Sequence, residues 1–170
     1  KDDIEQRLKV ALRAERVVWL DHGNLIGDDT DGHIDTIVRT APENTLLYVG
    51  CDDSHDEQYE DFLALEHQLM GLRTSTGMPY RLLRLPMPDA IYDEGERLPA
   101  TYANFLIING AVICPTYAQP AKDKQALQTI AQAYPDREII GIDARTVIKQ
   151  HGSLHCLTMQ FPQGVIANNP

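Results

Sequence analysis

The hydrophobic and polar positions of this chain follow two different periods. Apolar residues recur at helical spacing in three stretches, which predicts helices over residues 4–14, 56–72 and 121–134. Shorter apolar runs are typical of buried strands, and they predict strands over residues 17–20, 45–51, 80–85, 102–108, 111–115, 138–142 and 153–161. A short helical turn is expected over residues 144–149.

Turn-forming residues separate these elements. Asn109-Gly110 is a strong two-residue hairpin signal between two of the predicted strands. The acidic, glycine-containing stretch 21–35 and the proline-bearing stretch 89–99 predict loops. Strands and helices alternate throughout, so we predict an α/β fold with repeated strand–strand–helix–strand units.

The last predicted strand would place neighbouring residues on opposite faces. Cys156 would then share its face with polar Thr158, which indicates a wet or reactive environment. Cys51 and Cys114 lie in apolar strands, so we expect both to be buried and inert. His155 would face away from Cys156, and we expect it to be packed or hydrogen-bonded rather than to act as a base.

The loop before residue 36 is the most unusual segment, with four carboxylates and one imidazole in the sequence DDTDGHID at residues 28–35. Like charges this close raise one another's proton affinity unless a cation or hydrogen-bond donors compensate. A calcium-binding EF-hand aligned on Gly32 fails, because Gly27 and Val38 stand where acidic ligands are required. In an extended segment, His33 and Asp35 would project to the same side, as the base and the carboxylate of one site should.

Composition narrows the classes of function. The chain has 170 residues, 43% of them hydrophobic, and is long enough for one sizeable core. Its 25 acidic and 15 basic residues give a net charge of −10, which argues against a nucleic-acid partner. No apolar run approaches the roughly 20 residues that span a bilayer. We therefore expect no membrane partner. Three scattered cysteines are too few for a disulfide framework, so we expect a cytoplasmic protein.

Residue types alone leave three hypotheses open. In the first, Cys156 is a nucleophile, His33 transfers protons, and Asp35 orients the base or holds a cationic substrate. The second is a zinc site formed by His33, Asp35, His155 and Cys156, although the usual short paired spacings are absent. The third is a non-catalytic domain with an acidic surface loop. The negative charge favours the first, since carboxylates beside a nucleophile suit a cationic electrophile such as a guanidinium.

The chain carries four segments in order: DDTDGHID at residues 28–35, YANF at 102–105, PDRE at 135–138 and GSLHCLTMQFP at 152–162. Together they resemble the agmatine deiminase family, which is grouped with the bacterial, Porphyromonas-type peptidylarginine deiminases in the guanidino-group-modifying superfamily. The joint presence of a GHxD-type and an HCxTxQxP-type motif makes the resemblance specific.

The resemblance implies a fold as well. Such a protein is a five-bladed pentein-type α/β propeller of repeated ββαβ units, and this chain has too few elements to complete the ring. Residues 1–170 are therefore expected to be the C-terminal portion of a single deiminase catalytic domain, with the N-terminal portion as partner. The family's N-terminal portion supplies a further guanidinium-binding Asp in an Arg-Asp motif, which this sequence lacks. The sequence is also compatible with a homo-oligomer.

The resemblance further implies residue roles. Cys156 matches the nucleophile, His33 the general acid and base, and Asp35 the carboxylate that grips two guanidinium nitrogens. Asp29 matches an acidic position near the distal amine of the substrate. The implied reaction is hydrolytic deimination without metal or organic cofactor. Agmatine would yield N-carbamoylputrescine and ammonia in putrescine and polyamine metabolism, and the alternative is peptidyl arginine converted to citrulline.

Two further residues complete the expected substrate-binding set, Asn104 in the YANF segment and Gly152 before the cysteine. The sequence departs from the agmatine deiminase pattern at His151 and at Ser153-Leu154. Because these positions flank the proposed nucleophile, they bear on substrate choice more than on the chemistry.

Overall fold

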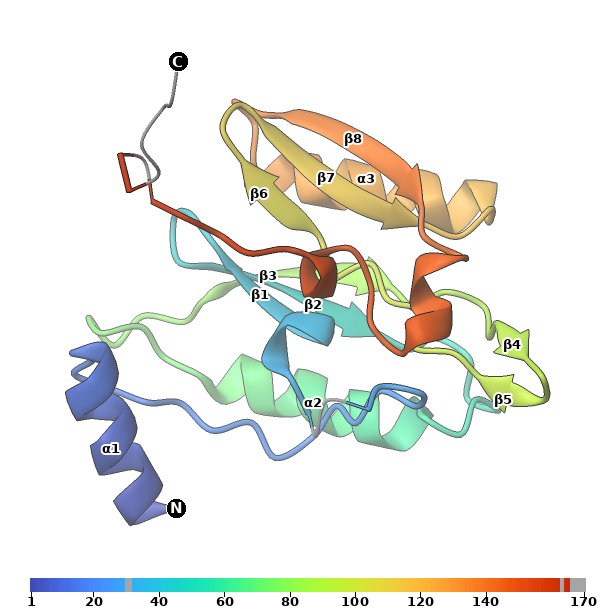
Figure 1. The fold of residues 1–170 in the computed structure, drawn as a ribbon. Helices are drawn as coiled ribbons and strands as arrows, with labels where there is room; N and C mark the ends of the chain where they lie inside the picture. Colours follow the sequence, from blue (N-terminus) through green and yellow to red (C-terminus); the bar gives the residue numbers. More distant parts are fainter. Residues whose placement is uncertain (30–31, 163, 166–170) are drawn as a thin grey trace.

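The computed structural model of the chain describes residues 1–29, 32–162 and 164–165, so Thr30 and Asp31 of the acidic motif lie outside the described residues. Two units of the same strand–strand–helix–strand order follow one another (Figure 1). The first contains β1 (Val38–Ala41), β2 (Thr45–Gly50), α2 (Tyr59–Gly71) and β3 (Arg81–Pro86). The second contains β6 (Leu106–Ile108), β7 (Ala111–Thr116), α3 (Pro120–Ala133) and β8 (Glu138–Asp143).

The two units have the same topology. In each, the first two strands form an antiparallel hairpin, and the third strand pairs in parallel with the second after a helical crossover. The resulting sheets have the orders β1-β2-β3 and β6-β7-β8. The predicted α/β fold of ββαβ units is therefore confirmed, as two separate small sheets.

Each helix covers one face of its own sheet. Val112 and Cys114 of β7 are fully buried, as are Ala126 and Ile130 of α3. Residues four apart lie on one face of a helix, and alternate residues lie on one face of a strand, so these side chains form the layer between helix and sheet. Helix α3 also contacts β3, and it thereby joins the two units.

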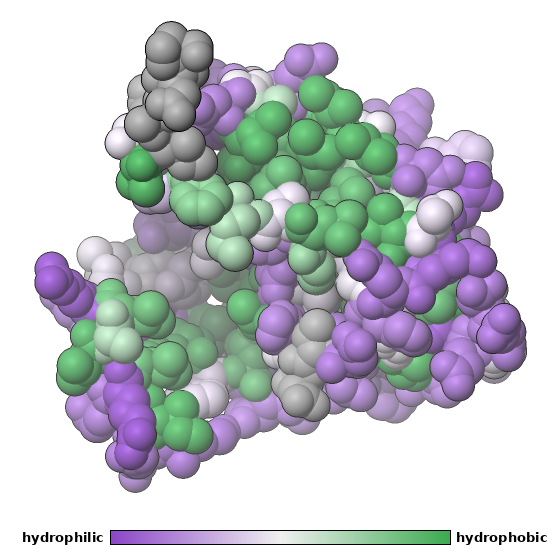
Figure 2. Space-filling model, viewed as in Figure 1, coloured by the Kyte–Doolittle hydropathy of each residue, from purple (hydrophilic) through white to green (hydrophobic). Residues whose placement is uncertain are grey.

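The opposite face of the second sheet is open in this chain. Ile108, Ile140 and Ile142 are 40%, 36% and 43% exposed. Figure 2 shows a continuous hydrophobic surface over β6, β7 and β8. An exposed apolar sheet face of this kind is typical of a surface that another structural element covers.

Polar contacts join the two units in addition to the packing of α3 against β3. Thr101 Oγ1 donates a hydrogen bond to Thr36 O at 2.6 Å, and Tyr134 Oη donates one to Thr40 O at 3.2 Å. Both pairs connect the segment around β1 with the second unit. This seam between the units also carries the candidate site.

Several predicted elements need correction. Residues 17–20 have no regular structure, and residues 102–105 form a turn and a short irregular segment before β6. The strand predicted over residues 153–161 is wrong, because that stretch begins with the 3₁₀ helix η3 (His155–Leu157) and continues irregularly. Strand β1 was not predicted.

The remaining elements are short or peripheral. They are α1 (Asp2–Leu12), the hairpin β4 (Tyr92–Asp93) and β5 (Glu96–Arg97), and the 3₁₀ helices η1 (Ile34–Thr36) and η2 (Val147–Gln150). Helix α1 has no buried residue and lies at one edge of the molecule (Figure 1). Among the described residues, no helix combines the length and apolar character needed to cross a membrane.

Candidate active site

A buried amide lies at the centre of the candidate site. Asn104 is fully buried, and its Nδ2 donates to Asp35 Oδ2 at 2.9 Å. Its Oδ1 accepts from the backbone N–H of His155 at 2.9 Å and of Cys156 at 3.3 Å. The Cys156 thiol also lies 3.5 Å from Oδ1. One side chain therefore joins two segments that are more than a hundred residues apart in sequence.

Asp35 is held as an anion. Its Oδ2 accepts a hydrogen bond of 2.6 Å from His155 Nδ1 in addition to the bond from Asn104. Burial raises the pKa of the Asp35 carboxyl, but the hydrogen bond from His155 and the charge of that ring outweigh burial and leave the pKa below its ordinary value. Both of these side-chain hydrogen bonds are made to Oδ2, and the Asp35 side chain is one-fifth exposed.

His155 therefore has a different place from the one that the strand pattern implied. The expectation that it is hydrogen-bonded is confirmed by its contact with Asp35. Strand alternation predicts that His155 faces away from Cys156, but both residues lie in the 3₁₀ helix η3, where that alternation does not apply. No local pattern could show this, because a contact with a distant Asn and Asp decides the conformation.

Cys156 is the exposed cysteine of the three. A Cβ atom added to Gly152 would lie 3.0 Å from Cys156 Cβ and 3.4 Å from its Sγ. Gly152 is itself buried, so the backbone there passes directly against the thiol-bearing residue. Gly152, Asn104, Asp35 and Cys156, four of the residues that the sequence analysis named for the site, thus lie together.

The other two thiols have the properties expected of inert cysteines. Cys114 is fully buried, and burial raises its pKa to about 12. Burial also raises the pKa of Cys51. Neither group is an available nucleophile at neutral pH.

His33 and Asp29 lie on the surface beside this cluster. His33 precedes η1 with its ring exposed, and it makes no side-chain hydrogen bond to another described residue. The argument for a shared side required an extended segment, and that condition is not met, because Asp35 lies within a 3₁₀ turn whereas His33 lies just outside it. Asp29 is exposed. The structure thus places both side chains within a few residues of the cluster but not in contact with Cys156.

The acidic loop is nevertheless tied to the cysteine segment. His151, one of the departures from the family pattern, has its Nδ1 2.9 Å from the carbonyl oxygen of Gly27. The ring N–H donates to that carbonyl and fixes the start of the loop. Ser153, the next departure, is buried with its hydroxyl 3.3 Å from Tyr117 Oη.

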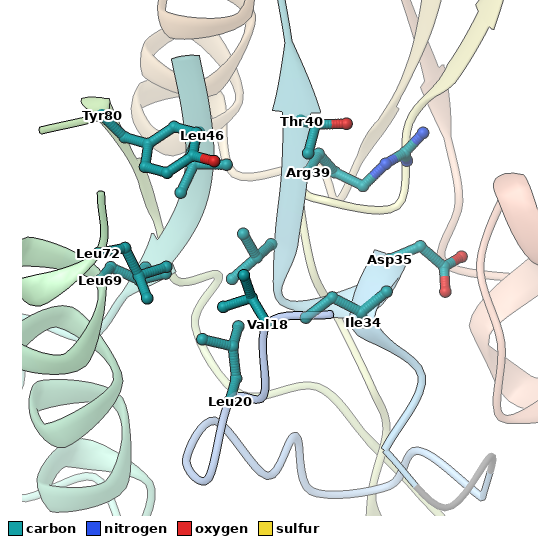
Figure 3. Close-up of a pocket in the computed structure, with 11 residues that line it drawn as sticks. Val18, Leu20, Ile34, Asp35, Arg39, Thr40, Leu46, Leu69, Leu72 and Tyr80 are labelled. Carbon is teal, nitrogen blue, oxygen red and sulfur yellow. The ribbon is translucent and has the colours of Figure 1, made fainter. Parts of the chain in front are cut away.

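An arginine that the sequence did not single out completes the surroundings. Arg39 Nη1 donates to Ala103 O at 3.0 Å and to Phe105 O at 2.5 Å. A pocket of about 300 Å³ lies beside β1 with mostly apolar lining. Figure 3 shows that the Asp35 carboxylate and the Arg39 guanidinium point away from its apolar side chains.

The arrangement does not form a metal site in the part of the chain that the structure describes. No group of three or more His, Cys, Asp or Glu there is placed to hold a metal ion. What the cluster offers is an exposed thiol next to a hydrogen-bonded, ionised carboxylate. Such a pair can bind a planar cation and attack it, since a carboxylate accepts two parallel N–H bonds from a guanidinium.

Comparison with known families gives a consistent result. The model of the Porphyromonas-type peptidyl-arginine deiminase family matches residues 1–162. A protein of Marinomonas sp. provisionally named agmatine deiminase is 35% identical over 96% of this chain and 48% of its own length. The resemblance predicted from the motifs is confirmed.

Solved structures show the same fold. A provisionally assigned arginine deiminase from Porphyromonas gingivalis is 55% identical with a TM-score of 0.93, covering 96% of this chain and 48% of that protein. A cysteine-to-serine variant of C. jejuni agmatine deiminase with substrate bound is 40% identical with a TM-score of 0.84, covering 91% of this chain and 44% of that protein. The chain thus spans about half the length of the relatives that it matches.

Proposed function

The chain belongs to the Porphyromonas-type peptidyl-arginine deiminase family, and on that premise we propose that it forms the nucleophile-bearing portion of an enzyme that hydrolyses a guanidinium group. Residues 1–170 would be the C-terminal portion of one catalytic domain. The two ββαβ units would be part of a five-bladed propeller that an N-terminal portion completes.

The hydrogen bonds of Asn104 carry the proposal. A deiminase must hold a guanidinium with a carboxylate while a nucleophile faces its central carbon. Asn104 bonds to Asp35 with its Nδ2 and to the backbone of Cys156 with its Oδ1. This joint attachment supports a bound guanidinium between the carboxylate and the thiol, with Gly152 leaving room beside the sulfur.

The proposed reaction has two steps. The Cys156 thiolate attacks the central carbon of the guanidinium and forms a C–S bond, and a C–N bond breaks as ammonia leaves with a proton from His33. Water deprotonated by His33 then attacks the same carbon of the thiouronium intermediate. The C–S bond breaks, the thiolate is regenerated, and a ureido product is released. No metal or organic cofactor takes part.

In the proposed role the His33 ring approaches Cys156, to which it has no hydrogen bond among the described residues. Its ring is exposed and not held by hydrogen bonds to other described residues, so reorientation breaks none of them. A general acid and base must come within hydrogen-bond reach of the proton that it transfers. Its position two residues before Asp35 keeps it next to the proposed guanidinium site.

We favour agmatine as the substrate, with peptidyl arginine as the alternative. Exposed Asp29 would attract the distal ammonium group of agmatine, and the His151–Gly27 hydrogen bond ties its loop to the cysteine segment. Relatives named as agmatine deiminases support this choice. The peptidyl-arginine deiminase family model supports the alternative.

The open sheet face supports the proposed N-terminal partner portion. Ile140 and Ile142 of β8 are exposed, and the relatives contain about twice the length of this chain. A further unit of the propeller would remove these side chains from water.

Replacement of the nucleophile tests the proposed function. In the natural full-length protein, Cys156→Ala should abolish ammonia release from agmatine, because no thiolate remains to form the covalent intermediate. Cys51→Ala and Cys114→Ala are the matched controls, and they should change stability without abolishing turnover. Ammonia release that persists in Cys156→Ala would end the deiminase interpretation.

A further inference from the structure

Arg39 contacts the main chain on both sides of the central asparagine. One guanidinium nitrogen, Nη1, donates to the carbonyl oxygens of Ala103 and Phe105, the residues directly before and after Asn104. The guanidinium carbon also lies 4.4 Å from the centre of the Phe105 ring, within the range of a cation–π contact. Arg39 therefore holds the main chain on both sides of Asn104.

These contacts of Arg39 connect the two ββαβ units. Arg39 extends from β1 of the first unit to the segment that leads into β6 of the second. Phe105 is fully buried, with its ring centre 5.9 Å from that of Tyr134 in an edge-to-face arrangement. Because the Phe105 ring is fixed by this packing, the guanidinium over it has a firm support.

A guanidinium in a partly buried position is costly unless its interactions offset the loss of water. Burial lowers the pKa of Arg39, and the charge of nearby Asp35 opposes this effect. Arg39 remains a cation, because an arginine side chain is not deprotonated in proteins. The same side chain thus contributes a positive charge close to the ionised Asp35.

We propose that Arg39 is a positioning residue that fixes the Asn104 amide, and through it the relative placement of Asp35 and Cys156, by holding the Ala103 and Phe105 carbonyls. The effect on turnover rests on the proposed deiminase function, whereas the effect on the order of the site does not. Displacements of about 1 Å at a reacting centre cost on the order of a hundredfold in rate.

Amide hydrogen exchange of the natural full-length protein tests the positioning directly. The backbone N–H of Cys156 donates to Asn104 Oδ1, and that of His155 donates to Oδ1 and to the backbone carbonyl of Asn104, so their exchange reports whether Asn104 is in place. Arg39→Met keeps an unbranched, largely apolar side chain and removes every donor. We expect exchange in segment 154–157 to rise about tenfold, whereas exchange in α2 stays unchanged.

Turnover and a conservative variant separate positioning from general destabilisation. Arg39→Met should lower kcat on agmatine about tenfold with KM within about threefold, because the loss lies in alignment rather than in substrate binding. Arg39→Lys keeps a cation with fewer donors and should recover part of both effects. Arg145→Met is the matched control, since Arg145 is exposed and pairs with Asp143.

The outcomes distinguish this inference from the proposed function. Wild-type exchange in segment 154–157 of a folded Arg39→Met protein, or an equal increase in Arg145→Met, would overturn the inference. Faster exchange in a protein whose wild type deiminates no guanidinium would support the inference and refute the proposed function. Where Arg39→Met does not fold, Arg39→Lys decides, with exchange about threefold faster than wild type as support and wild-type exchange as refutation.

Discussion

Gly152 lies so close to Cys156 that a side chain there would be in tight contact with it. An added Cβ atom would be 3.0 Å from Cys156 Cβ, so one of the two residues must move. We expect Gly152→Ala to lower kcat/KM at least about tenfold, because the sulfur is displaced from its line of attack. The crowding should also cost about 1–3 kcal/mol of unfolding free energy. Steady-state kinetics and denaturant unfolding measure the two effects.

Gly71 provides the matched control for this substitution. It lies at the end of α2, and an added Cβ would meet no other atom within 4 Å. Gly71→Ala should leave kcat/KM unchanged and stabilise the helix by up to about 1 kcal/mol. Wild-type kcat/KM in Gly152→Ala would contradict the close approach to the nucleophile.

The pairing of Asp35 with His155 makes stability depend on pH. The pKa of Asp35 is lower in the folded chain than its unfolded value of about 3.9. The stability that this anion contributes is therefore complete above the unfolded pKa and is lost as pH falls through the folded pKa. We expect the Tm difference between wild type and Asp35→Asn to shrink as pH is lowered from about 5 through that range.

Exposed Asp136, whose side chain has no hydrogen bond to another described residue, is the control. Asp136→Asn should follow the wild-type Tm at each pH. A wild-type advantage over Asp35→Asn that stays constant down to the lowest pH would show that the carboxylate does not gain stability from His155.

At the scale of elements, the sequence predicts those parts whose apolar pattern lies within the element itself. Helices α2 and α3 carry apolar residues at helical spacing, and strands β2 and β7 are short apolar runs, with every residue of β2 buried. The Asn109-Gly110 pair also predicts its hairpin turn correctly. Ile108 pairs with Ala111 directly across it. The ββαβ order followed from these elements.

The elements that form the site were the ones that the sequence missed. Strand β1 is only four residues long. Its Arg39 interrupts the apolar pattern, because that side chain donates a hydrogen bond to the distant Ala103 carbonyl. The segment around Cys156 alternates like a strand, yet Asn104 binds two of its backbone N–H groups and the chain turns. Motif resemblance found Cys156 and Asp35, but not the polar contacts between distant segments that bring them together.

At the scale of the whole molecule, the exposed face of β6–β8 predicts poor behaviour of the chain on its own. Ile108 and Ile142 are both exposed there, and Figure 2 shows the hydrophobic surface over these strands. We expect the 170 residues expressed alone to aggregate and to release no ammonia from agmatine, because a large apolar patch favours association. Light scattering and an ammonia assay measure this, with the full-length protein as control. Robust turnover by the isolated chain would contradict it.

The choice of substrate is also a property of the whole molecule, since agmatine, arginine and peptidyl arginine share the reacting group and differ at the far end. A distal ammonium near exposed Asp29 would gain a charge-assisted hydrogen bond. A free α-carboxylate would meet repulsion from the acidic loop instead. The departures from the family pattern at His151 and Ser153 would fit a wider entrance to the substrate site, which favours a larger substrate. However, the His151 side chain is hydrogen-bonded to the carbonyl oxygen of Gly27.

We therefore expect the full-length enzyme to prefer agmatine over free arginine and over an N-blocked arginine amide by at least tenfold in kcat/KM, about 1.4 kcal/mol of discrimination. Asp29→Asn keeps the size of the side chain and removes its charge, so it should erase most of that margin while sparing turnover of the blocked amide. Asp2→Asn, on exposed helix α1, should leave the margin intact. If the blocked arginine amide is the better substrate of the wild-type enzyme, peptidyl arginine replaces agmatine as the proposed substrate.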